Sequence, residues 1–287
     1  MKNISLKLKS ILKSILIMCI FFSCDSRKSQ EENADKRLKH IQELIDQNSF
    51  NAAKNEIDSI HALFPMFVDK RRIAAALSDT VLRRESTRSL SYCDSILPGK
   101  IHAMDSIQKN FRFEKDKKYQ EIGNFVYKTE QTENNANRTY LKTYVDENAD
   151  FYLVSNYCGV KIEQQSVEVS VNELFAHSDT ISLSDANNHR YDDGGSHFES
   201  IIFKNESGKS VVEFIMQTSS KVLKITLHGK KTYSYYLADA DKNAIIETYR
   251  LWKVKKDVVQ LQKEIKKATL RISRINNSKK SINKLEK

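Results

Sequence analysis

The stretch LWKVKKDVVQLQKEIKKATLRISRI, residues 251–275, carries the strongest structural pattern in this chain. Its apolar residues follow one another at alternating steps of three and four: Leu251, Val254, Val258, Leu261, Ile265, Ala268, Ile272 and Ile275. Such a heptad repeat predicts a long helix with an apolar seam that packs against another helix. Lysines and arginines occupy the other faces, which indicates a solvated surface. Contact of these cations with acidic lipid or lipopolysaccharide is the functional alternative.

The expected partner of this seam lies in the first half of the same chain. Helical spacing runs through residues 67–97 and again from about 100 to 113, with Pro98-Gly99 as an interruption. Pairing of these helices with the seam would leave the residues between them as an inserted unit. A parallel homodimer through residues 251–275 is the alternative, so we expect a monomer or a homodimer.

Two shorter helical runs precede this region. They cover residues 34–45 and 50–64, with polar residues 47–49 between them, and they predict an αα-hairpin. The hairpin resembles a single tetratricopeptide repeat, and the residues that carry the resemblance are Leu44, Phe50, Ala53 and Pro65. Repeat arrays need about three units to bury a continuous core. We therefore expect a packed helical hairpin and no peptide-binding solenoid.

Residues 117–240 have the alternation that is typical of strands. Apolar residues recur at every second position in short runs, for example at Val212, Phe214 and Met216, and polar segments separate the runs. We expect about nine to eleven strands in an antiparallel sandwich or partly closed barrel. Residues 119–240 hold 16 of the 26 aromatic residues, which predicts cross-strand packing, with a sugar-stacking subset as the alternative.

Together these patterns predict an α+β fold. A helical hairpin and long helices precede an antiparallel β-sandwich or barrel-like domain, which is inserted before a heptad helix that packs back on the N-terminal helices. The expected segments are a signal peptide (1–23), a lipidated tether (24–33), a helical region (34–116), a β domain (117–240), a coiled-coil-like helix (241–278) and a basic tail (279–287). Charge supports this division, because residues 119–240 carry a net charge of −6 and residues 241–287 carry +9.

The first 24 residues have the pattern of an export signal. Four lysines precede the apolar run 15–22, which is shorter than the ~20 residues of a bilayer-spanning helix. The run ends in Phe21-Phe22-Ser23-Cys24, and polar residues follow. These features resemble the signal and lipobox of a bacterial lipoprotein, in the Bacteroidota form with an aromatic first position. The resemblance implies cleavage before Cys24, a lipid on its thiol, and anchorage in the cell envelope, at the outer membrane in preference to the inner one. An ordinary secretory signal with a chance cysteine is the alternative.

Two cysteines remain once Cys19 leaves with the signal and Cys24 is acylated. These are Cys93 and Cys158, and no CxxC spacing for redox chemistry or zinc is present. We expect them to behave as small buried hydrophobic residues, with one disulfide in an oxidising envelope as the alternative.

Histidines and carboxylates gather between residues 177 and 199. The cluster consists of His177, Asp179, Asp185, His189, Asp192, Asp193, His197 and Glu199. Imidazole and carboxylate groups bind zinc or harder cations, so the candidate metal ligands are His177, His189, Asp192, Asp193 and His197. Their spacing matches no metal-binding motif, and the composition of residues 192–195 is typical of a turn. A polar loop is therefore the expected structure.

The other short motifs in the sequence do not match a catalytic motif. Gly208-Lys209-Ser210 resembles the end of a phosphate loop, but Phe203 stands where that loop needs glycine, and the flanks predict strand–turn–strand. The chain has no GxSxG motif and no Cys/His nucleophile pair that stands out. The arginines of residues 71–88 form either an anion-binding face or a solvated face. The sequence thus indicates no catalytic residue and no cofactor.

The expected function is that of a membrane-anchored envelope lipoprotein. It would act as a non-enzymatic binding or scaffold module for a protein or glycan partner, without nucleic acid. Two alternatives remain. An envelope hydrolase requires His177, His189, Asp192 and His197 to converge in one pocket. A structural subunit of an envelope complex requires an exposed apolar patch along the seam or on a sheet face.

Overall fold

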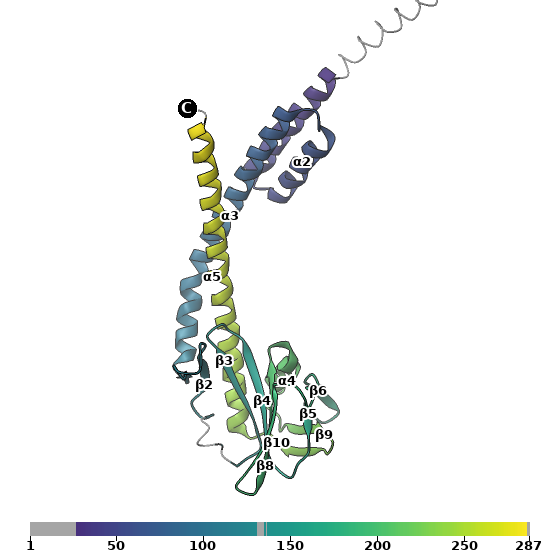
Figure 1. The fold of residues 1–287 in the computed structure, drawn as a ribbon, viewed down its shortest axis with the longest axis vertical. Helices are drawn as coiled ribbons and strands as arrows, with labels where there is room; N and C mark the ends of the chain where they lie inside the picture. Colours follow the sequence, from purple (N-terminus) through teal and green to yellow (C-terminus); the bar gives the residue numbers. More distant parts are fainter. Residues whose placement is uncertain (1–26, 131–134, 136, 286–287) are drawn as a thin grey trace, which may run out of the picture. The chain divides into compact units, whose positions relative to one another are not determined.

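The computed structural model describes residues 27–130, 135 and 137–285, and these residues divide into two compact units. The helical unit contains the described residues up to Cys93 and those from Glu264 onward, and the β-rich unit spans Asp94–Lys263. Two long helices, α3 (Val68–Gln108) and α5 (Asp239–Leu285), contribute to both units (Figure 1). The predicted signal and its lipidation site Cys24 lie outside the described residues.

The helical unit contains the predicted αα-hairpin. The first helix occupies residues 27–46 and α2 occupies Phe50–Leu63, with Asn48 at a positive φ of 57° in the turn between them. Ile41 and Ile60 are fully buried in the core that these helices share with α3. Residues 27–33, the described part of the expected tether (24–33), form the start of this first helix.

Helix α3 runs through Pro98 without ending, so the predicted interruption at this proline is wrong. A proline inside a helix removes one backbone hydrogen bond and costs ~3 kcal/mol. Packing after the proline holds the helix in place. Met104 and Ile107 pack with Leu251 and Phe111, and Lys100 forms an ion pair of 2.6 Å with Asp257 on α5.

The heptad seam packs within the chain, as predicted. Leu251 and Val258 are buried in the β-rich unit, and Ala268 and Ile275 are buried in the helical unit. The other four seam residues are half-buried. The C-terminal helix therefore covers its apolar stripe against helices of the same chain, and the α+β prediction is confirmed.

Among the described residues of the β-rich unit, ten strands form two antiparallel sheets. The six-stranded sheet has the order β1-β2-β3-β4-β8-β7 and the four-stranded sheet has the order β10-β9-β5-β6. The strands are β1 (Phe111–Glu114), β2 (Asn124–Tyr127), β3 (Tyr140–Asp146), β4 (Phe151–Gly159), β5 (Gln164–Val171), β6 (Leu174–His177), β7 (Asn188–Asp193), β8 (Ser196–Lys204), β9 (Lys224–Gly229) and β10 (Tyr233–Tyr236). One core joins both sheets through their inward-facing residues, including Leu141, Leu153, Val167, Phe203 and Leu227.

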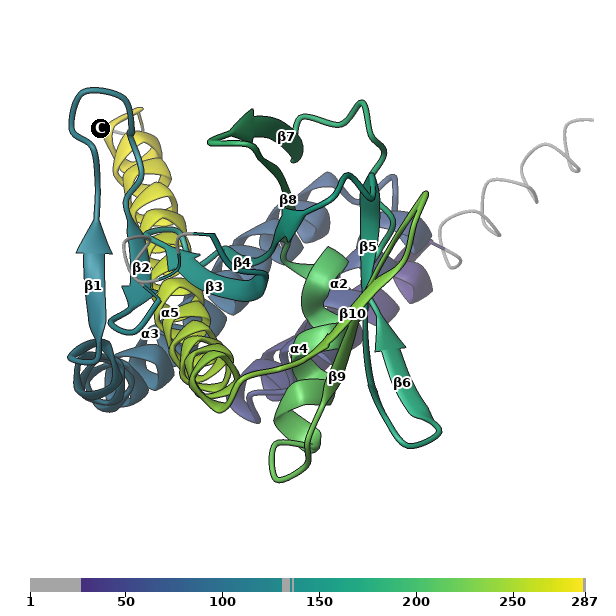
Figure 2. The same ribbon diagram turned by 90° about the horizontal axis from the view of Figure 1, so that it is seen from below.

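A helix, α4 (Glu206–Gln217), replaces the strand that was predicted around Val212, Phe214 and Met216. It contacts β4 and β8 of one sheet and β5 and β6 of the other, and it lies between the two sheets in Figure 2. Val211, Val212 and Ile215 are fully buried, which is helical spacing. The alternation in this segment predicted the wrong period because Phe214 and Met216 also pack against the core from the sides.

The same correction applies to Gly208-Lys209-Ser210, which lies inside α4, shortly after the end of β8, and not in a strand–turn–strand segment. A Cβ on Gly208 would lie 2.9 Å from Cβ of Phe203 and 3.1 Å from Cβ of Leu153. This glycine therefore allows α4 to approach β8 and β4 closely, which explains its presence without a phosphate.

Cys93 and Cys158 are both free thiols, so the alternative of a disulfide between them is not realised. Cys93 is buried and Cys158 is half-buried, which agrees with the expected packing role. Among the helices of the described residues, none carries an apolar segment long enough to cross a bilayer.

Candidate functional site

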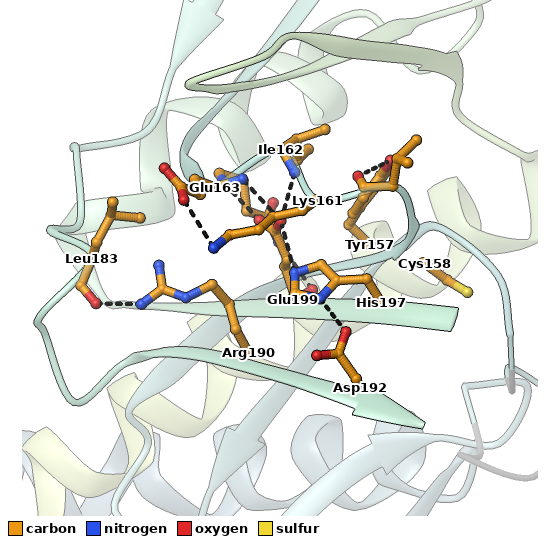
Figure 3. A network of polar contacts seen from close by, with 12 residues as sticks. Tyr157, Cys158, Lys161, Ile162, Glu163, Leu183, Arg190, Asp192, His197 and Glu199 are labelled. Atoms are coloured by element: carbon orange, nitrogen blue, oxygen red, sulfur yellow. Dashed lines mark hydrogen bonds and ion pairs between the residues drawn. The ribbon is translucent and has the colours of Figure 1, made fainter. Parts of the chain in front are cut away.

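Glu199 lies at the centre of a polar network in the β-rich unit (Figure 3). It is 1% exposed and projects from β8 toward the segment that leads into β5. One carboxylate oxygen, Oε1, accepts the backbone N–H groups of Ile162 and Glu163 at 2.8 Å each, and Oε2 accepts that of Gln164 at 2.6 Å. Three N–H donors satisfy this buried carboxylate.

The backbone around Glu163 has the shape that this arrangement requires. Its φ is +55°, so consecutive N–H groups turn toward one side of the chain and form a concave anion-binding nest. The nest holds Glu199 of the same chain, which ties the six-stranded sheet to the start of the four-stranded sheet. We interpret Glu199 as a residue that positions β5.

His197 extends the network to the surface. Its Nδ1 lies 2.6 Å from Oδ1 of Asp192, and its Nε2 lies 3.3 Å from Oε1 of Glu199. The His197 side chain is 14% exposed and that of Asp192 is 83% exposed. A carboxylate–imidazole–carboxylate series is present, but its inner carboxylate is already occupied by backbone donors.

The structure separates the other predicted metal ligands. Alternation along β7 places His189 and Asp193 on the face opposite to Asp192, which shares its face with Asn188 and Arg190. His177 lies on β6 in the other sheet. The four side chains that the hydrolase alternative needs do not share one pocket. The sequence 192–195 forms the expected turn, in which Gly194 and Gly195 both have positive φ and join β7 to β8.

A pocket of about 270 Å³ opens on the outward face of the six-stranded sheet. Strand register builds it, because Tyr140, Asn156 and Ser200 stand side by side in one cross-strand row of β3, β4 and β8. The next row on the same face pairs Phe198 with Tyr191. The pocket is lined by Asn135, Asn137, Arg138, Tyr140, Asn156, Tyr157, Tyr191, Asp193, Phe198, Glu199 and Ser200.

Flat side chains and hydrogen-bonding groups alternate along this lining. The rings of Tyr191 and Phe198 stack with centroids 5.0 Å apart and planes 10° apart, and Tyr191 is 56% exposed. The Arg138 guanidinium lies 4.6 Å above the Tyr140 ring. Ser200 donates to the Asn156 amide oxygen at 3.0 Å. An exposed aromatic face thus borders a polar floor.

A buried charge cluster supports the floor. Arg138 pairs with Asp241 at the start of α5 and donates to Asn135 at 2.6 Å. Glu130 is 1% exposed and its Oε2 has no hydrogen-bond partner among the described residues. Burial, followed by the negative charge of Asp241, raises the pKa of Glu130 to about 8. Burial and the charge of Glu130 raise the pKa of Tyr140 to about 12, so its hydroxyl is protonated at neutral pH.

The part of this pocket that comes from outside residues 177–199 was not predicted from the sequence. Arg138, Tyr140 and Asn156 belong to β3, β4 and the segment before them, and only strand register brings them to Tyr191 and Phe198. Their one signal was alternation, since Tyr140 and Asn156 each precede an inward-facing residue in a run with period two.

Comparisons of the chain with protein-family models, with curated proteins and with solved structures gave no match.

Proposed function

We propose that this chain is a membrane-anchored lipoprotein of a bacterial envelope whose β-rich unit binds a glycan without transforming it. The exposed Tyr191 ring beside a polar pocket is the observation that carries the proposal. In this interpretation the lipid on Cys24 supplies the membrane contact, and residues 177–199 contribute a wall of the binding site instead of a catalytic loop.

The lining suits the chemistry of a sugar ring. A pyranose has an apolar C–H face that packs on a flat aromatic ring, and a rim of hydroxyl groups that needs planar donors and acceptors. Tyr191 offers such a face, and its stacking on Phe198 fixes the ring in one orientation. Arg138, Asn156 and Ser200 supply donors and acceptors from the floor.

The size of the pocket favours part of a longer glycan. At about 270 Å³ it is slightly smaller than the ~300–1,000 Å³ of sites that enclose drug-sized ligands. We expect it to hold one ring or a chain end, with the remaining sugars lying outside on the sheet face.

The nearby carboxylates favour binding over hydrolysis. Glycoside hydrolysis needs two carboxyl groups that face the scissile bond from opposite sides. The carboxyl groups in the pocket lining are those of Asp193 and Glu199. Glu199 is engaged by three backbone N–H groups, so among the described residues of this lining Asp193 has no second free carboxyl group opposite it.

The test is binding of the purified full-length chain, in mild detergent, to an array of bacterial envelope oligosaccharides. Stacking of an aromatic pair is worth ~0.5–1.5 kcal/mol beyond area burial, and 1.4 kcal/mol corresponds to tenfold in affinity. We expect Tyr191→Ala to weaken binding of the selected glycan roughly tenfold. Tyr119→Ala, at a tyrosine that is 75% exposed and outside the pocket, should leave it unchanged. Equal losses in both variants, or no glycan bound by the wild type, would refute the proposal.

A further inference from the structure

Three potential metal ligands meet on the outward face of the four-stranded sheet. Glu168 lies in the middle of β5, His177 stands directly opposite it on β6, and His228 lies on the other neighbour, β9, opposite Ser166. Val167 and Val169 are fully buried, so alternation turns Glu168 outward. The sheet thus presents a carboxylate between two imidazoles that come from segments far apart in the chain.

The distances between these groups are those that a small cation requires. Oε2 of Glu168 lies 3.2 Å from Nε2 of His228 and 3.7 Å from Nε2 of His177. One ligand atom from each of the three residues lies within 4.8 Å of the others. Ligands of a tetrahedral ion with bonds of ~2.0–2.2 Å are separated by about 3.3–3.6 Å. Both carboxylate–imidazole distances are close to this value. The 46% exposed side chain of His177 is free to close the third distance by rotation.

The arrangement differs from a simple His–Glu ion pair. One such pair, His40 with Glu43, lies on the first helix, where Nδ1 and Oε2 are 3.7 Å apart and no second histidine is in the contact. At Glu168, two histidines instead point the same ring nitrogen at the same carboxylate oxygen. Two imidazoles at one carboxylate oxygen repel each other when protonated, whereas a divalent cation between them satisfies all three groups.

The ligand types select a class of metal. Two imidazoles and one carboxylate suit zinc and neighbouring divalent transition metals, whereas Ca²⁺ and Mg²⁺ prefer sets made of oxygen alone and Cu⁺ prefers thiolate or thioether. We propose that Glu168, His177 and His228 bind Zn²⁺ or a similar divalent transition metal. Three protein ligands leave a fourth coordination position open for water or for a group on a bound molecule. Phe175 borders the site. It is 61% exposed, and its ring packs edge-on against that of His177, with the two ring centroids 5.1 Å apart.

This proposal is independent of the glycan pocket, because the metal site lies on the other sheet and uses none of the pocket residues. A negative result for the metal site would therefore not contradict the glycan proposal, and the reverse also holds.

The experiment is a titration of the full-length chain, stripped with a chelator, with ZnCl₂ by calorimetry and with CoCl₂ by visible absorption. We expect one equivalent of metal to bind, with the intense visible bands of tetrahedral Co²⁺. Loss of a ligand should weaken binding by at least the roughly 10–100-fold seen on loss of groups that only support metal ligands. The variants are His177→Gln, His228→Gln and Glu168→Gln, which keep similar size on an outward sheet face, and circular dichroism verifies that each is folded.

Two control variants make the outcome specific. His40→Gln alters a histidine that also faces a glutamate and should bind metal as the wild type does. His197→Gln tests whether metal goes instead to His197 and Asp192. Absence of stoichiometric binding by the wild type, or loss of binding in His197→Gln with retention in His228→Gln, would overturn the proposal.

Discussion

Two buried glutamates of the β-rich unit differ in the hydrogen-bond partners of their carboxyl groups. Glu199 and Glu130 are each 1% exposed. The Glu199 carboxylate accepts three backbone N–H groups from the nest at residues 162–164. Glu130 lies beside Asp241 and has one oxygen without a hydrogen-bond partner among the described residues. Equal burial therefore has different consequences: backbone donors satisfy the Glu199 carboxylate, whereas burial and Asp241 raise the pKa of Glu130.

The two glutamates therefore have different roles: Glu199 holds the backbone in place, whereas Glu130 belongs to a cluster that can change its charge. The Glu199 nest joins two sheets and engages both carboxylate oxygens with backbone N–H groups. The Glu130 cluster lies behind the Arg138 floor of the pocket and holds a carboxyl group with a pKa of about 8, raised by burial and by Asp241. A bound ligand that approaches Arg138 acts on a cluster whose charge changes near neutral pH.

The largest effect is expected at the nest. Glu199→Gln keeps the side-chain volume, removes the charge, and turns an amide N–H₂ toward backbone donors. Hydrogen bonds to charged groups are worth ~1.5–3 kcal/mol and a buried donor left without a partner costs ~1–3 kcal/mol, so we expect a loss of about 3 kcal/mol in the free energy of unfolding. Urea denaturation measures it. Glu163→Gln, in the same segment but with its side chain 25% exposed beside Lys161, is the control and should cost far less. Similar losses in both variants would show that the three hydrogen bonds do not hold the nest.

The next effect is a pH dependence that belongs to Glu130. Its pKa is raised from 4.5 to about 8, so the folded chain holds a proton that the unfolded chain has released. The stabilisation is complete below pH 4.5 and is lost as the pH rises to about 8. The slope is at most about 1.4 kcal/mol per pH unit. Glu130→Gln cannot titrate at this position, so its free energy of unfolding should fall less steeply than that of the wild type between pH 5 and 8 (a window set by this pKa).

Urea denaturation at several pH values measures this slope. Glu121→Gln, at an exposed glutamate, provides the matched control and should retain the wild-type slope. A slope that is unchanged in Glu130→Gln would mean that the folded chain does not hold a proton on Glu130 in this pH range, which would contradict the prediction.

Repetition explains which parts of the fold the sequence predicts. The apolar residues of the seam 251–275 keep the same heptad period over seven steps, so the helix prediction does not depend on any single residue. The segment of α4 is short, and its β-branched and aromatic residues satisfy both a period of two and a helical period. Close packing of Gly208 on Phe203 and Leu153, together with contacts to both sheets, selects the helix. These contacts involve residues that are distant in the chain, so the local pattern does not contain them.

Cross-strand register explains why the candidate sites were predicted only in part. Tyr191, Phe198 and Asp193 lie within the polar region 177–199 that the sequence indicates. Arg138 and Asn156 reach them only through the pairing of β3, β4 and β8. His177 was likewise selected from the sequence, but its neighbours Glu168 and His228 are 60 residues apart in the chain, and their contact depends on β5 pairing with β9.

The smallest effect is expected at the outer end of the Glu199 network. Asp192 is 83% exposed, so water and salt screen its 2.6 Å contact with His197, and surface ion pairs of this kind contribute ~0.2–1 kcal/mol. Asp192→Asn should therefore lower the free energy of unfolding by about 0.5 kcal/mol or less, and by less still in high salt, because screening already weakens the pair. The double variant Asp192→Asn with Glu199→Gln tests whether the two carboxylates act as one system through His197. Additive losses mean that Glu199 serves the backbone nest alone. A coupling above ~0.5 kcal/mol, the usual limit for independent sites, would mean that the imidazole transmits the surface charge to the buried carboxylate.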